Sequence, residues 1–402
     1  MYNSYFNPIS NNLYENIKNI NSSYQIKNYL HQEFVDQLNS ITDDECDLLN
    51  KKLIKNKSII NEILELNNNI SIDELENIMG TNLQCIDDLI DCSKIYETMN
   101  DKQKINILKS IYSNMFMPLR IIQWIEELAT ELFVITFNNI TIYLISDTKM
   151  DNLVTHIVTI VKWLLMISGK NNKKLDLYLF LSDIIKEIPH KCNKKECSLK
   201  RENINSGTSY HDNWIHIYRK EELLKVLIHE LIHYLEIDIN SYAYIIDSYC
   251  SHILMHEKSK PILVNEAYTE FLAIYLHTLY ISKYISHYSK NSLEEIFFEL
   301  LLNEERFTLY QINKIFKISG IEDISYFRKS NDFIQHTNVI SYFILKYIFL
   351  INAKYFIKTY KTKKITLKLT EKIIKGFFKL KIPKIDVLNN DTSLRMSLYE
   401  LK

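Results

Sequence analysis

The stretch VLIHELIHYL, residues 226–235, places His229, Glu230 and His233 in the spacing H-E-x-x-H within an otherwise uncharged run. On an α-helix, residues four positions apart lie on the same face, one turn from each other. Both imidazoles can therefore reach one metal ion, while Glu230 is rotated about 100° from His229 toward the side of that ion. The stretch predicts a buried helix that binds a metal.

This spacing is that of a zinc metallopeptidase helix, in which the two histidines bind zinc and the glutamate acts as general base. Chance produces it in roughly 0.03 of chains with this histidine and glutamate content. The alternative is a core helix whose histidines only make local hydrogen bonds. Burying two histidines and a glutamate without a metal would be costly. We therefore favour a metal site and expect a hydrolase.

A third protein ligand is needed, because catalytic zinc takes three and keeps its fourth position open. A His or Asp at 239 after a glycine turn at 236 would supply it, but the chain has Glu236 and Ile239 there. Glu236 continues the same straight helix and cannot complete a tetrahedron with the two histidines. Asp238 is not excluded by its spacing, although no turn residue precedes it.

Residues 264–273, VNEAYTEFLA, place Glu266 and Glu270 one helical turn apart among apolar residues. This N-E-x-x-x-E element resembles the second motif of the gluzincin metallopeptidases, the class typified by thermolysin and neprilysin. The resemblance implies that Glu266 is the third zinc ligand and that Glu270 is the outer carboxylate orienting His229. It also implies one zinc ion per chain. Many gluzincins carry aspartate at the position of Glu270.

A wider resemblance joins residues 205–210 (NSGTSY), 217–233 (IYRKEELLKVLIHELIH) and 265–273 (NEAYTEFLA). Together they are similar to gluzincin-type metallopeptidases encoded by giant DNA viruses. The chain is crowded with Asn, Ile, Lys and Tyr and has only 5 Gly and 5 Pro, as AT-rich viral and protozoan genomes produce. We expect an intracellular, soluble protein, in the host cytoplasm or the virion if its source is viral.

The overall composition narrows the classes of partner. The 402 residues carry a formal net charge of −1, which argues against nucleic acid or an anionic membrane. Six cysteines in so long a chain do not form a disulfide framework. Cys192 and Cys197, beside His190, lack the C-x-x-C spacing and are disfavoured as a second metal site. No signal peptide is visible, and the apolar runs at 153–168 and 339–357 contain lysines, so we expect no membrane segment.

Residues 1–130 are expected to form an N-terminal helical region, because their apolar residues recur with the period of a helix. The region carries no chemical motif, and a prodomain, a lid and an adaptor all stay open as its role. Its expected helices lie at residues 24–38, 43–66, 72–78 and 102–132.

Residues 131–240 are expected to form the upper lobe of a zincin-like fold. Residues 133–145 and 175–181 are β-branched and aromatic, which predicts strands on either side of a helix at 153–168. Residues 214–218, WIHIY, alternate in polarity just before the metal helix, so we expect the edge strand there. An edge strand can hold an extended peptide beside the metal through backbone hydrogen bonds.

Residues 241–402 are expected to form a helical lower lobe that carries the third ligand. Residues 361–384 contain nine Lys against one Glu, which we interpret as a solvated face. The expected helices are that of Glu266, to about residue 284, and those at 293–302, 309–318 and 337–360.

One further donor from this lobe is expected to stabilise the oxyanion, and the candidates are His336, Tyr342 and Tyr347. We favour Tyr342 because SYFILK, residues 341–346, resembles the corresponding stretch of the viral relatives. His252 and His256 form a second i,i+4 pair, which we interpret as a surface coincidence.

These expectations combine into an α+β, predominantly helical protein with a two-lobed, zincin-like domain. We expect a zinc-dependent peptidase that acts on a peptide or protein substrate, with Glu230 as general base. The alternatives are a catalytically inactive zincin fold serving as a structural, scaffold or virion protein, a structural metal site with a fourth protein ligand, and a zinc hydrolase of non-peptide amides or esters. The oligomeric state stays open.

Overall fold

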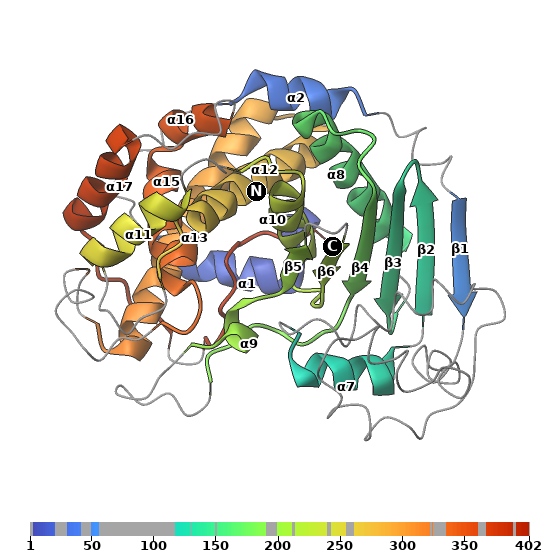
Figure 1. The fold of residues 1–402 in the computed structure, drawn as a ribbon, viewed down its shortest axis with the longest axis horizontal. Helices are drawn as coiled ribbons and strands as arrows, with labels where there is room; N and C mark the ends of the chain where they lie inside the picture. Colours follow the sequence, from blue (N-terminus) through green and yellow to red (C-terminus); the bar gives the residue numbers. More distant parts are fainter. Residues whose placement is uncertain are drawn as a thin grey trace.

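The fold is α+β and mostly helical, with one mixed sheet of six strands (Figure 1). The sheet lies at one side of the molecule and the longest helices at the other. The computed structural model describes residues 3–20, 30–41, 50–55, 117–129, 131–148, 151–189, 199–210, 214–238, 243–254, 261–321, 324, 335–360, 367–388 and 391–401.

The sheet combines antiparallel and parallel pairs. In spatial order the strands are β1 (Asn50–Lys55), β2 (Glu131–Phe137), β3 (Ile140–Ser146), β4 (Leu175–Phe180), β6 (Trp214–Ile217) and β5 (Gly207–Tyr210). β1, β2 and β3 are antiparallel neighbours, β3, β4 and β6 are parallel neighbours, and β5 pairs with β6 in the antiparallel sense. The β2–β3 hairpin turns at Asn138, whose φ of 49° suits an asparagine.

Helices cover both faces of the sheet, which explains why β4 is buried along its whole length. α8 (Asp151–Ser168) is the crossover between the parallel strands β3 and β4. α7 (Leu119–Leu128) covers the opposite face, where Trp124 packs with Tyr143 and Tyr178 in one apolar cluster.

α10 (Leu223–Tyr234) lies between the sheet and the helical part of the molecule (Figure 1). It contacts α8 and β5 on one side and α12 on the other. This position buries nearly the whole helix, including the stretch VLIHELI. The helical part consists of α11 (Ala243–Leu254), α12 (Val264–Ser286), α13 (Leu293–Ser319), the π-helical turn η4 (Ile340–Leu345), α15 (Lys346–Ile351), α16 (Ala353–Phe356), η5 (Ile357–Tyr360) and α17 (Leu367–Lys379).

The described N-terminal segments pack against distant parts of the chain. α1 (Pro8–Ile17) packs on α13, the Tyr5 hydroxyl of η1 (Asn3–Tyr5) donates to the Tyr288 carbonyl, and Phe6 forms a β-bridge with Leu401. α2 (Gln32–Asn39) packs on α8, where the Trp163 indole N–H donates to the Phe34 carbonyl over 3.2 Å. α2 therefore belongs to the apolar core that contains the sheet, whereas Phe6 and α1 pack in a second apolar cluster with α12, α13 and the C-terminal residues.

Residues 391–401 cross the interior without regular structure, and Leu394, Ser397 and Leu398 are fully buried. Buried carboxylates accept the backbone N–H groups that no helix or strand satisfies. Glu222 accepts from the amides of Met396 and Ser397, and Glu304 accepts from that of Leu398. We call residues 391–401 the C-terminal strap.

The prediction that residues 214–218 form the edge strand is wrong. Residues 214–217 form β6, which lies inside the sheet between β4 and β5. The edge beside α10 is β5, Gly207–Tyr210, a short strand of small and hydroxyl-bearing residues without apolar alternation. Local β propensity favours the apolar strand, whereas the edge position is decided by which segment pairs with it.

Several boundaries of helices and strands also differ from those predicted from the periodicity of apolar residues. Asn50–Lys55 is a strand inside the expected helix 43–66, because it pairs with β2, and the rest of that helix and the one at 72–78 lie outside the described residues. Of the expected helix 102–132, the described part forms α7, which begins at Leu119 and ends at Leu128, and residues 102–116 lie outside the described residues. The expected strand 133–145 is a hairpin of β2 and β3. Helices 293–302 and 309–318 are one helix, α13, since the polar residues between them are buried and bonded.

Residues 337–360, expected to be one helix, are divided into η4, α15, α16 and η5. Within the described part of the chain, no single helix is long and apolar enough to cross a membrane. The bent pair Ile340–Ile351 and Ala353–Thr359 passes the same test only when taken together, across a 90° bend. Nearly all side chains of its first member are buried in this protein's own core.

Candidate metal centre

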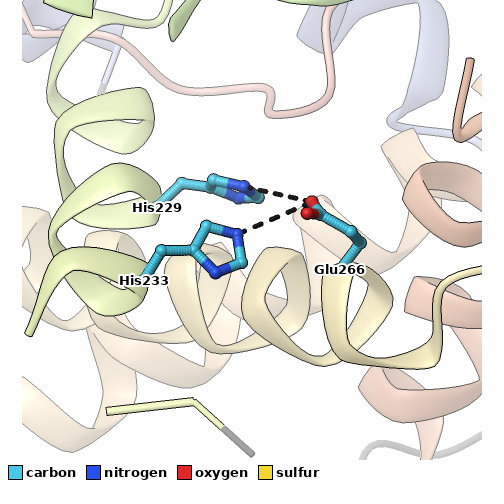
Figure 2. A group of neighbouring side chains, drawn as sticks. All are labelled: His229, His233 and Glu266. Carbon is cyan, nitrogen blue, oxygen red and sulfur yellow. Dashed lines mark ion pairs between the residues drawn. The ribbon is translucent and has the colours of Figure 1, made fainter. Parts of the chain in front are cut away.

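Two packed helices bring the sequence motifs together. α10 carries His229, Glu230 and His233, and the first turn of α12 carries Glu266. Figure 2 shows both imidazoles pointing from α10 toward the Glu266 carboxylate. His229 and Glu230 are each only 7% exposed, His233 and Glu266 are partly exposed, and all four line one cleft.

Three atoms converge on one point at this place. Oε2 of Glu266 lies 3.7 Å from Nε2 of His229 and 3.6 Å from Nε2 of His233. These separations are too long for hydrogen bonds. They are close to the roughly 3.3 Å that separates two ligands bound tetrahedrally to zinc at 2.0–2.1 Å. Among the described residues, this is the group of His, Cys, Asp and Glu side chains that could hold a metal ion.

Each imidazole is oriented by a carboxylate of its own. Nδ1 of His229 lies 2.8 Å from Oε2 of Glu270, and Nδ1 of His233 lies 2.7 Å from Oδ2 of Asp238. A proton held between Nδ1 and the carboxylate leaves the Nε2 lone pair directed at Glu266. Asn265 donates to the same Asp238 oxygen over 2.9 Å and holds it in place.

The role of Asp238 was missed in the sequence, where it was weighed only as a ligand. Reaching His233 requires the chain to turn back directly after α10. Glu236 makes that turn with a φ of 54°, a left-handed conformation that the sequence does not signal because no glycine stands there. The amide of Ile237 then donates to the carbonyl of Ile232 over 2.9 Å and closes the turn.

Two buried lysines stabilise the negative charge of Glu270. Lys225, one turn before His229 on α10, forms an ion pair with Glu270, and Nζ of Lys346 lies 4.0 Å from the same carboxylate. Burial opposes the negative charge. The Lys225 ammonium and the hydrogen bond to His229 nevertheless hold the pKa of Glu270 at about 2. Glu270 is therefore an ionised acceptor for the His229 ring.

Glu230 faces the cleft, which has a volume of about 420 Å³. Burial raises the pKa of Glu230, against the opposing effect of the two histidines. The cleft wall is polar and includes the edge strand β5, Asn205, Asn265 and Asn338.

The three expected oxyanion donors lie in different places. Tyr342, in the π-helical turn η4, lines the cleft, and its hydroxyl donates to Oε2 of Glu266 over 3.0 Å. Burial, together with the Glu266 charge, keeps the pKa of Tyr342 well above its ordinary value, so the hydroxyl stays a donor. Tyr347 instead donates to Glu305 in the core, and His336 is exposed and does not line the cleft.

The second histidine pair considered in the sequence does not join this centre through its described member, His252. His252 is exposed on α11. Its expected partner His256 lies outside the described residues, as do His190, Cys192 and Cys197.

Comparison with known proteins gives a partial similarity. No protein-family model matches the chain, and no solved structure matches it. The chain is 25% identical over 118 residues to an uncharacterised protein of Acanthamoeba polyphaga mimivirus. The match covers 29% of this chain and 29% of that relative, so the chain spans less than a third of its length. This similarity relates part of the chain to a giant-virus protein.

Proposed function

We propose that this chain is a zinc-dependent peptidase of the gluzincin class, with a zincin-like division between a sheet-containing lobe and a helical lobe. The observation that carries the proposal is the convergence of His229, His233 and Glu266 in a cleft that Glu230 also faces. The outer carboxylates Glu270 and Asp238 support it, because they orient both imidazoles toward the same point.

The donor set fits zinc. Two imidazole nitrogens and one carboxylate oxygen are the protein ligands of many catalytic zinc sites, which keep a position open. Nε2 of His233 is buried without a hydrogen-bond partner, which is costly unless an ion or water satisfies it. A zinc ion held by these three residues would polarise the scissile carbonyl and acidify a water molecule.

Glu230 is proposed to move the proton. Its carboxylate accepts a proton from the attacking water and delivers it to the nitrogen of the leaving amine. The raised pKa that burial gives Glu230 suits this exchange, since a general base works best when its pKa lies near the operating pH. Tyr342 is proposed as the donor to the oxyanion. Its hydroxyl would have to leave Glu266 and turn into the cleft.

We propose that the backbone of the peptide substrate binds along the edge strand β5. Among the strands that the structure describes, β5 pairs with β6 alone, and it lines the cleft beside Glu230. Free backbone groups on such an edge can pair with an extended peptide. This arrangement favours a peptide over an unrelated amide or ester as the substrate.

Zinc content and peptide cleavage test the proposal together. Wild-type protein, washed with a mild chelator, is expected to hold about one zinc per chain. Glu266→Ala should lose that zinc. His252→Ala, which removes an exposed histidine from α11, is the matched control and should keep it. A library of fluorescence-quenched peptides then serves as substrate, and Glu230→Gln should keep zinc while losing on the order of 10²–10⁴-fold in rate.

The outcomes separate the alternatives. A wild type without zinc, even after titration, contradicts the proposal. Full zinc binding by Glu266→Ala rules out the gluzincin arrangement. If wild type binds zinc but cleaves no peptide, the inactive zincin fold with a structural or virion role is the better interpretation.

A further inference from the structure

Gly207, the first residue of β5, lies against the helix that carries Glu230. A Cβ built on Gly207 would lie 3.0 Å from Cγ and from Oε1 of Glu230, and 3.0 Å from Cγ1 of Val226. Distances this short are tighter than ordinary packing allows. The backbone of β5 therefore rests directly on the face of α10 at the position of the Glu230 side chain.

Backbone conformation does not explain this glycine. Among the described residues, the glycines with positive φ are Gly169 and Gly320, and Gly207 is not one of them. An alanine could adopt the backbone of Gly207 without strain. Space is the remaining reason, because a Cβ at residue 207 would press on the Glu230 side chain, which would have to shift by a few tenths of an ångström.

The strand cannot easily retreat from α10 to make room. Gly207 is paired with Ile217 of β6, and the amide of Tyr218 donates to the carbonyl of Ser206 over 2.9 Å. Just before β5, the Asn205 carbonyl accepts from Nε of Arg219 over 3.3 Å. A side chain added at Gly207 should therefore displace Glu230 and leave β5 in place.

Ser209 acts on the same carboxylate from the same strand. Residues two apart in a strand point to the same face, so Ser209 follows Gly207 along the side that meets α10. The Ser209 hydroxyl lies near the Glu230 carboxylate and opposes the rise in its pKa. The absence of a side chain at Gly207 and the hydroxyl of Ser209 thus together fix the position of the Glu230 carboxylate in the cleft.

We propose that Gly207 is a positioning residue: its missing side chain lets the Glu230 carboxylate lie against β5, in the same cleft as His229, His233 and Glu266. The inference rests on the proposed function, in which Glu230 is the general base. It adds that the edge strand positions that base, beyond any contact it makes with a substrate.

The test is Gly207→Ala, with Gly376→Ala as the matched control. Gly376 is also tightly packed, since a Cβ built on it would lie 3.1 Å from Cγ2 of Ile348, but it lies in α17 away from the cleft. Zinc affinity is measured by competition with a chelator, and kcat and KM are measured on a library peptide that wild type cleaves. For Gly207→Ala we expect unchanged zinc affinity and KM and a kcat lower on the order of 10²-fold. Gly376→Ala should match wild type.

A double-mutant cycle with Glu230→Gln identifies the contact. Once the general base is removed, displacing the side chain at residue 230 costs little more, so Gly207→Ala should lower kcat less in the Glu230→Gln background than in wild type. Additive losses overturn the inference, as does a Gly207→Ala variant with wild-type kcat. Loss of zinc in Gly207→Ala also overturns it, because the residue would then support the whole centre. A wild type that cleaves no peptide instead removes the proposed function on which the inference rests.

Discussion

Replacing Glu222 with glutamine measures how much the buried charges behind α10 stabilise the protein. Glu222 directly precedes α10, and its ion pair with Lys186 is almost completely buried, with side chains 0% and 1% exposed. Burial opposes the Glu222 charge, but Lys186, Lys225 and Arg395 together hold its pKa below the ordinary range. The carboxylate is therefore charged at pH 7 and also accepts three hydrogen bonds from Met396 and Ser397 of the C-terminal strap.

Glu236 at the other end of α10 provides a matched control. Like Glu222 it has a left-handed backbone, with φ of 54° against 59°, and like Glu222 it pairs with a lysine. Its pair with Lys170, at 2.6 Å, is partly exposed, with side chains 46% and 30% exposed. The backbone cost of a non-glycine residue at positive φ is the same in wild type and in both variants, so it cancels from the comparison.

Glu222→Gln leaves Lys186 charged and buried without its partner. Breaking a buried pair in this way costs about 3–5 kcal/mol, and we expect about 3 kcal/mol because Glu221 also lies near Lys186 and glutamine keeps one acceptor oxygen. Glu236→Gln should cost less than about 1 kcal/mol, as exposed pairs do.

The free energies of unfolding are measured by urea titration at pH 7, with all proteins at the same zinc concentration. Equal losses in the two variants, or a loss below about 1 kcal/mol in Glu222→Gln, would refute the reasoning.

Two further predictions concern the metal centre and the sheet. Asp238→Ala frees the His233 ring and should weaken zinc binding about 10–100-fold in a chelator competition, whereas Asp183→Ala, at an exposed site, should leave it unchanged. Equal zinc affinity in both variants would show that Asp238 does not support zinc binding through His233. Burial lowers the pKa of His216 to about 3, so between pH 7 and pH 5 the unfolded chain takes up a proton that the folded protein cannot. Stability is lost as the pH falls, and His216→Phe should reduce that loss by about 2 kcal/mol in urea titrations at the two pH values. An unchanged loss would mean that His216 is protonated in the folded protein.

Much of the candidate centre could be found in the sequence because its signals are local. The i,i+4 spacing of His229 and His233 depends only on helix geometry, and the apolar flanks indicated that the helix would be buried. Glu266 could be assigned only through the resemblance to the gluzincins. Nothing in the sequence of its own helix indicates that it contacts His233, which lies 33 positions earlier. Asp238 escaped notice because a glutamate makes the turn that a glycine usually makes.

The sheet shows where local patterns fail. Periodicity found β4 and β6 by their apolar residues, but it favoured β6 as the edge and gave no weight to β5. Strand order depends on backbone pairing between segments, and such pairing leaves no trace in the propensity of either segment alone. The same holds for the polar residues inside α13, which looked like a break until buried partners accounted for them.

The spacing of His229, Glu230 and His233 on one buried helix can be read from the residues alone, because helix geometry repeats every turn. Long-range packing sets which carboxylate orients each imidazole, that β5 lies against Glu230, and that Glu222 binds the C-terminal strap 175 positions away. These contacts join distant segments. They form where burial forces charged and polar groups to find partners, and local periodicity carries no information about which partner that will be.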